Sequence, residues 1–140
     1  MLLGWREWIS IPELSINQVK AKVDTGARTS CLHAFYLNTY RERGVLMLHF
    51  KVHPLQANKK IVVECHAEAI DRRMVTDSGG HKERRYVIYT PICLGGHTWP
   101  IEITLTNRDI MRYRMLLGRT ALREDILVAP SLSFQQGKTY

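Results

Sequence analysis

The chain has 140 residues, enough to bury one substantial hydrophobic core, and we expect a single domain over residues 1–140. Hydrophobic residues make up 45% and charged residues 24% of the composition, which excludes an intrinsically disordered chain. No apolar run is long enough to cross a membrane, and three scattered cysteines do not form a disulfide framework, so we expect a cytoplasmic protein with no membrane contact. The net charge of +7 favours an acidic partner, and by itself it does not choose among nucleic acid, a membrane surface and an acidic polypeptide.

Apolar and polar residues alternate along much of the chain, a pattern typical of half-buried β-strands. The alternation predicts strands over residues 18–23, 45–53, 61–69 and 98–106. Short strands separated by clusters of Gly, Pro, Asn and Asp favour an all-β barrel or sandwich. A helix is predicted only over residues 119–126, with a short turn over 107–113 and an extended or loosely ordered tail over 131–140.

An Asp-Thr-Gly sequence follows the first of these strands. Asp24, Thr25 and Gly26 are by themselves ordinary turn chemistry, because Gly tolerates a positive φ and Asp bonds its own backbone. Much later in the chain, two leucines, a glycine and an arginine at residues 116–119 precede the predicted helix. Both motifs together, in a short all-β chain, are far more specific than either one alone.

The two motifs and the opening stretch "REWISIPEL…VKAKVDTGARTSCLHA" resemble the retropepsin-like aspartic proteases, which are single-lobed and homodimeric. The resemblance is closer still to a bacterial family labelled "ATP-dependent zinc protease", and it extends from Trp5 to about Val128. It implies an all-β, closed-barrel acid-protease fold with one short C-terminal helix. It also implies a homodimeric aspartic endopeptidase.

The resemblance also assigns roles to individual residues. Asp24, Thr25 and Gly26 would form the catalytic turn. The structural support of that turn would come from Leu116, Leu117, Gly118 and Arg119. From the residue type and position alone, we expect Arg119 to form an ion pair near the helix start rather than a catalytic contact.

Aspartic peptidases need two carboxyl groups that face each other and share one proton, because two neighbouring like charges cannot both stay ionised. One carboxylate then takes a proton from water while the protonated partner polarises the scissile carbonyl group. The chain has one convincing Asp-Thr-Gly and is too short for two lobes. The second aspartate is therefore expected from a second copy across a two-fold axis.

Residues 74–89 read as two strands joined by a Gly-rich tip, which matches in position the flap that closes over substrate in the related proteases. The tip contains an Asp-Ser-Gly sequence, a rival catalytic turn that we reject because no apolar strand precedes it. The predicted substrate-binding residues are Ala27, Arg28, Asp77, Ser78, Gly79, Gly80 and Arg84. Arg28 and the basic run at residues 82–85 would make the cleft positive and favour an acidic, glutamate-rich peptide.

No metal site or other cofactor is predicted, although the family label mentions zinc. The sequence lacks His-Glu-x-x-His, and neighbouring residues such as Cys65 and His66 point to opposite faces of one strand. Relatives of this kind occur beside or fused to ATP-grasp ligases that add glutamates to a ribosomal protein, which implies a possible ligase partner. A non-catalytic binding or scaffold domain and a basic, nucleic-acid-binding β-barrel remain the alternative functions, the latter leaving both motifs unexplained.

Overall fold

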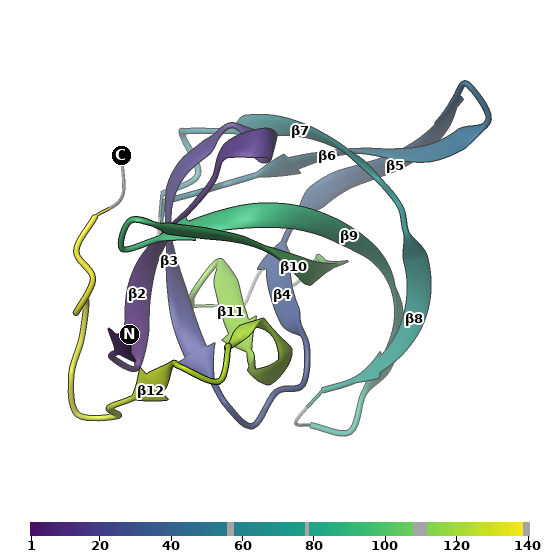
Figure 1. Ribbon diagram of the computed structural model, residues 1–140. Helices are drawn as coiled ribbons and strands as arrows, with labels where there is room; N and C mark the ends of the chain where they lie inside the picture. The colour runs from purple at the N-terminus through teal and green to yellow at the C-terminus, as the bar shows by residue number, and fades with distance from the viewer. Residues whose placement is uncertain (56–57, 78, 108–111, 139–140) are drawn as a thin grey trace.

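The computed structural model describes residues 1–55, 58–77, 79–107 and 112–138 (Figure 1). Its strands are β1 (Leu2–Leu3), β2 (Arg6–Ile11), β3 (Ile16–Asp24), β4 (Ser30–His33), β5 (Phe35–Glu42), β6 (Val45–Val52), β7 (Val63–Glu68), β8 (Asp71–Thr76), β9 (Lys82–Leu94), β10 (His97–Thr106), β11 (Met115–Gly118) and β12 (Leu127–Val128). The described helical segments are two 3-10 turns, η1 (Pro12–Leu14) and η2 (Arg119–Ala121). The all-β class expected from the sequence is confirmed.

The main sheet closes on itself. Its strands follow the order β10-β4-β11-β3-β2-β9-β8, and β9 also pairs with β10, so that all of these strands except β8 form a closed circuit. β11 lies between β3 and β4, parallel to the first and antiparallel to the second. Figure 1 shows β9 and β8 curving around the body, which brings the end of their hairpin to the same end of the molecule as the loop after β3.

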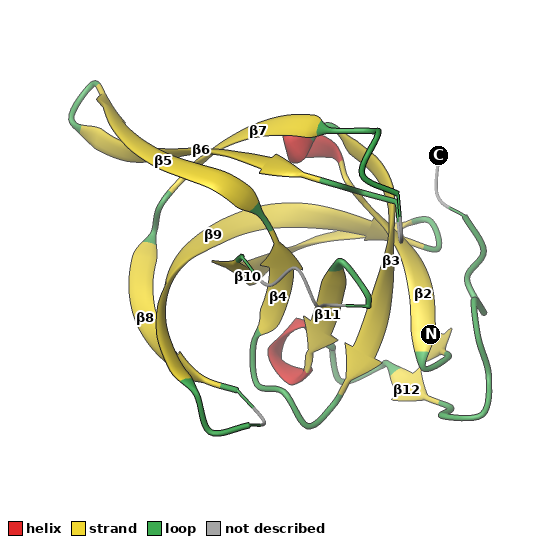
Figure 2. Cartoon of the chain, turned by 180° about the vertical axis from the view of Figure 1, so that it is seen from behind, coloured by secondary structure: helices red, strands yellow, loops and turns green. Residues whose placement is uncertain are grey.

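A second sheet of three strands, in the order β5-β6-β7, lies against this circuit. The alternation predicted for residues 45–53 is confirmed, since Leu48, Phe50 and Val52 are fully buried. These side chains share one hydrophobic cluster with residues of β2, β3, β9 and β10. The far part of the β5–β6 hairpin extends away from the body (Figure 2).

The helix predicted over residues 119–126 was wrong in extent. Only Arg119–Ala121 forms a 3-10 turn, and Leu122 is already extended. The indole N–H of Trp99 donates to the carbonyl oxygen of Ala121 at 2.9 Å, which occupies an acceptor that a continuing helix would use. Of the turn predicted over 107–113, residues 108–111 lie outside the described part. No helix among the described residues is long and apolar enough to span a membrane.

The C-terminal tail is held by one buried side chain, Glu7 of β2. Its carboxyl oxygens accept hydrogen bonds from the backbone N–H groups of Gly4 at 2.6 Å, Gln135 at 2.9 Å and Gln136 at 3.1 Å. The rings of Phe134 and Trp8 stack with centroids 5.6 Å apart. The tail that the sequence predicted as extended or loosely ordered is therefore fastened to the start of the chain.

We predict that Glu7→Gln lowers the free energy of unfolding by about 1–3 kcal/mol. The glutamine amide has one acceptor oxygen where the carboxylate has two. Its NH2 group cannot accept a hydrogen bond, so at least one backbone N–H group that was bonded to Glu7 loses its partner. Urea unfolding followed by circular dichroism measures the change. Glu13→Gln, at an exposed position, is the matched control. Equal stability of the two variants would contradict the anchoring role of Glu7.

Candidate active site

Asp24 is the last residue of β3, and its side chain is held by the turn that follows. Its Oδ1 atom accepts hydrogen bonds from the backbone N–H groups of Gly26 at 3.0 Å and Ala27 at 3.2 Å. The residue itself is half-buried, whereas Thr25 and Gly26 are exposed. The turn thus fixes the orientation of a carboxyl group that solvent or a ligand can reach.

The second motif lies directly beside this turn. In the parallel pairing of β11 with β3, Gly118 is opposite Asp24. The backbone N–H of Arg119 donates to the carbonyl oxygen of Ala27 at 2.7 Å, and its guanidinium donates to that of Thr25 at 3.4 Å. The expected ion pair of Arg119 is replaced, within the described residues, by these bonds to the turn. The two motifs far apart in sequence therefore form one structural unit.

Gly118 is required here by space rather than by its backbone angles, since its φ of −84° and ψ of 170° are open to any residue. A Cβ atom at this position would lie 2.5 Å from the carbonyl carbon of Thr29 and 2.8 Å from the backbone nitrogen of Ser30. Its N–H donates to the buried Ser30 hydroxyl at 3.0 Å. β11 consequently touches both ends of the Asp24 turn.

A cleft of about 1020 Å³ lies between this turn and the β8–β9 hairpin. Five of the predicted catalytic and substrate-binding residues line it: Asp24, Gly26, Ala27, Arg28 and Asp77. Leu116 also lines it, while Leu117 is fully buried behind. The other predicted substrate-binding residues in the described part, Gly79, Gly80 and Arg84, are exposed and are not among the lining residues, and Ser78 lies outside the described residues.

The β8–β9 hairpin has the predicted form of two paired strands with a Gly-rich tip. Thr76 is opposite Lys82, and the Asp77 Oδ1 atom accepts hydrogen bonds from the N–H groups of Gly79 and His81, each at 2.9 Å. Gly80 has a φ of +84°, which glycine adopts without strain. Asp77 and Gly79 of the Asp-Ser-Gly sequence thus serve a hairpin turn, and Asp77 lines the same cleft as Asp24.

Sequence reasoning placed both Arg84 and Arg85 in the basic run of the cleft but named only Arg84 as a substrate-binding residue, and it left out Arg73 and the acid Glu102. Residues 84 and 85 point to opposite faces of β9, and Arg85 is the buried one. Its guanidinium donates to Glu83 at 3.0 Å and to the Cys31 sulfur at 3.6 Å. Strand alternation could have shown which of the two arginines faces the cleft, if the inward face of β9 had been known.

Arg73 of β8 and Glu102 of β10 form a two-point ion pair at the cleft, with N–O distances of 2.7 and 2.9 Å. These hydrogen bonds are the largest influence that holds the pKa of Glu102 below its usual range. The charge of Arg28 adds a smaller effect in the same direction. Arg73 also donates to Asp71 at 2.7 Å. Arg73 and Arg85 are therefore occupied by internal partners, whereas the Arg28 side chain is exposed and its guanidinium forms no hydrogen bond with the described residues.

The residues present do not fit a zinc ion. No group of three His, Cys, Asp or Glu side chains in the described part of the chain could hold a metal. Burial raises the pKa of the Cys65 thiol to about 12, which opposes the thiolate form that zinc requires. The His66 ring stacks on His49 at 4.6 Å, nearly parallel, so their nitrogen lone pairs do not converge on one point.

We predict that Gly118→Ala lowers the free energy of unfolding by about 2–4 kcal/mol, because the added methyl group meets backbone atoms that can move only by displacing the Asp24 turn. Chemical denaturation measures the loss. The control is Gly44→Ala in the β5–β6 turn, where φ is +80° but no atom lies within 4 Å of the added carbon. That variant costs about 1–2 kcal/mol through backbone strain alone. A smaller loss for Gly118→Ala than for the control would contradict the close contact.

We predict that the Arg73–Glu102 pair stabilises the protein at neutral pH by about 1 kcal/mol or less, since both side chains are partly exposed to solvent. The pKa of the Glu102 carboxyl group is lower in the folded than in the unfolded protein. The stability that this difference contributes is therefore fully present at a pH above the unfolded-state pKa, and it is lost as the pH falls through the folded-state pKa. Glu102→Gln should therefore be less stable than wild type at pH 7 and equally stable in strong acid. Thermal unfolding across this range tests it, with exposed Glu124→Gln as control; a difference independent of pH would contradict the ion pair.

Comparison with known proteins agrees with this geometry. A family model described as "Retropepsin-like aspartic endopeptidase RimB" matches residues 2–139. A solved structure of a Legionella pneumophila protein of unknown function superposes with a TM-score of 0.82 at 27% sequence identity, covering 96% of this chain and 97% of that one.

Curated relatives named "Probable alpha-L-glutamate ligase" are 47% identical in Shewanella halifaxensis and 43% identical in Desulfotalea psychrophila, each over 137 residues. The match covers 98% of this chain but only 30% of each relative, so the chain spans less than a third of their length. Because the family model covers nearly every residue, the chain belongs to the RimB-like family of retropepsin-like aspartic endopeptidases.

Proposed function

We propose that this chain is an aspartic endopeptidase that acts as a homodimer, with Asp24 as its catalytic residue. The observation that carries the proposal is the position of the Asp24 carboxyl group, which two backbone N–H groups fix in the wall of a cleft of about 1020 Å³. Membership of a retropepsin-like family supports the same chemistry. Preorganised groups of this kind lower the barrier because they need no rearrangement during the reaction.

The partner for Asp24 in this proposal is Asp24 of a second copy. Two other acids line the cleft among the described residues, Asp77 and Glu102. Glu102 is paired with Arg73, and Asp77 accepts the hydrogen bonds that shape the hairpin tip. In this proposal both acids keep these structural roles, and a symmetric dimer supplies the second carboxyl group.

In the reaction, one Asp24 carboxylate takes a proton from a water molecule, which attacks the peptide carbonyl carbon. The other Asp24, protonated, donates a hydrogen bond to the carbonyl oxygen as negative charge develops there. The proton taken from water then passes to the leaving amine as the C–N bond breaks. Thr25 and Gly26 act by keeping each carboxyl group at the same place on the dimer axis.

An acidic peptide, rich in glutamate, is the substrate class that we propose. Arg28 is exposed in the cleft wall while Arg73 and Arg85 are bound to internal groups, so Arg28 is the guanidinium free to grip a carboxylate of the substrate. The relatives named as glutamate ligases support this chemistry and a ligase of that type as a partner. A glutamate tail on a ribosomal protein is one substrate of this kind.

A second function is favoured by the size of those relatives. Their much longer chains are named as ligases, and a domain within a ligase could bind the glutamate product without cutting it. In that case the cleft would be a binding groove and Asp24 would have no chemical role. Cleavage therefore separates the two functions, whereas binding of acidic peptides is common to both.

We predict that Asp24→Asn abolishes cleavage of a glutamate-rich peptide, lowering kcat by at least about a thousandfold, while the fold is retained. An amide is nearly the same shape but cannot take a proton from water. Peptide hydrolysis followed by mass spectrometry measures the loss, and circular dichroism verifies the fold. Asp125→Asn is the matched control, since that side chain is 65% exposed and far from the turn in sequence.

The same assay tests the substrate class. Matched glutamate and glutamine peptides should differ in rate at low salt, and the difference should shrink as salt screens the charges. Arg28→Gln should reduce it further. Equal rates for both peptides at low salt would exclude the acidic preference. Binding of the glutamate peptide to wild type without any hydrolysis would instead favour the binding domain.

A further inference from the structure

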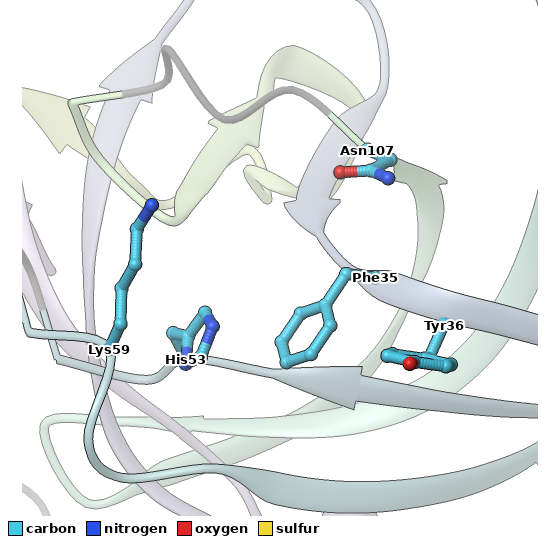
Figure 3. A pocket seen from close by; sticks show the side chains of 5 residues that line it. All are labelled: Phe35, Tyr36, His53, Lys59 and Asn107. Carbon is cyan, nitrogen blue, oxygen red and sulfur yellow. The ribbon is translucent and has the colours of Figure 1, made fainter.

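A second pocket lies at the other end of the β4–β10 strand pair from the Asp24 turn. It has a volume of about 410 Å³ and is lined by Phe35, Tyr36, His53, Lys59 and Asn107 (Figure 3). Figure 3 shows the Phe35 and His53 rings close together, Asn107 above them and the Lys59 side chain extending along the other side. The pocket shares no lining residue with the cleft.

The backbone at this pocket departs from regular strand geometry. The register of β5 with β6 shifts between Phe35 and Asn38, which marks a β-bulge. Within the bulge Tyr36 has a φ of +54°, an unfavourable conformation for a bulky residue, and the residue is 67% exposed. Bulges and strained residues are over-represented beside binding sites, where they redirect a side chain. Here they turn an aromatic ring toward the pocket and away from the core.

Two lysines lie at this pocket. Lys59 lines it and is exposed, and the Lys51 ammonium lies 4.7 Å from the centre of the Tyr36 ring. Neither forms an ion pair with a described residue, and Glu64, opposite Lys51 on β7, is bonded to His49. Two ammonium groups beside an amide and an imidazole make a site for carboxylate groups.

The pocket and the cleft are joined by the same two strands. Cys31 and Thr104 line the cleft, and Phe35 and Asn107 line the pocket. Cys31 and Phe35 are four residues apart along the β4–β5 segment, and Thr104 and Asn107 are three residues apart at the end of β10. The β4 and β10 strands run parallel. At the rise of a β-strand, this separation is about 10–13 Å, or about four residues of an extended peptide.

We propose that this pocket is a second binding site for the acidic peptide, holding carboxylates that lie beyond the part bound in the cleft. The inference rests on the proposed acidic substrate but not on its cleavage. The pocket binds side chains on the distal part of a long peptide, and it thereby favours long glutamate tails over short ones. Lys59 and Lys51 supply the charge, and the Tyr36 and Phe35 rings supply the surface against which the peptide methylene groups pack.

The test is the affinity of fluorescent polyglutamate peptides of about four and about twelve residues, a range set by the distance between the sites. Anisotropy is measured with the full chain carrying Asp24→Asn, so that no peptide is cut. The double variant Lys51→Gln, Lys59→Gln should bind the long peptide about tenfold more weakly, which is the loss expected when two exposed ion pairs are removed. Its affinity for the short peptide should be unchanged. Lys60→Gln with Lys138→Gln removes the same charge outside the pocket and should leave both affinities near those of the parent.

Two results for the Lys51→Gln, Lys59→Gln variant would overturn the second site. One is an unchanged affinity for the long peptide. The other is an equal loss of affinity for the short peptide, which would show a general charge effect. A short single-stranded RNA is included in the same titration. An equal or larger loss of RNA binding would assign the pocket to nucleic acid and refute the peptide proposal. If the length-dependent loss is found but the unmodified chain cuts no peptide, the second site stands and the peptidase function fails.

Discussion

The candidate site depends on the contact between β11 and the turn that carries Asp24. β11 pairs with β3 on one side and β4 on the other, so it closes the gap between the two strands that the turn connects. Only a residue without a side chain fits at position 118, where the backbone of Thr29 and Ser30 approaches. The hydrogen bonds from Arg119 and Thr120 to the turn follow from that approach. A carboxyl group on an exposed loop is thereby held by the core of the sheet.

Internal pairing decides which charges of the cleft are available to a ligand. A bidentate pair with Glu102 occupies Arg73, and Glu83 and Cys31 occupy Arg85. The chain's net charge of +7 therefore overstates the positive charge that a substrate meets in the cleft. What remains is Arg28 beside the Asp24 turn and, at the far end of the same strands, the lysines at the second pocket. An extended acidic chain could contact both without bending, because the strands themselves set the spacing.

Cleavage and binding make different demands on this fold. Cleavage by the proposed mechanism needs two carboxyl groups, of which each copy would bring one, so activity would be coupled to dimer concentration. Binding of an acidic chain needs only the surface of one copy. This difference is compatible with the presence of a similar segment in much longer relatives that are named as probable glutamate ligases, because binding would not require the second carboxyl group.

Local pattern determined much of this protein. Alternation over residues 45–53 and 98–106 predicted their strands, the Gly-rich tip predicted the hairpin, and two short motifs with their family resemblance predicted the all-β fold and Asp24. Such features depend on neighbours in sequence, where side-chain period and turn chemistry act. Only the tertiary structure decided that residues 122–126 are not helical, because Trp99 binds the carbonyl oxygen where the helix would continue. The tertiary structure alone also showed that Arg85 rather than Arg84 lines the cleft and that Glu102 pairs with Arg73. Contacts between distant strands depend on how the sheet closes, and no local pattern specifies that closure.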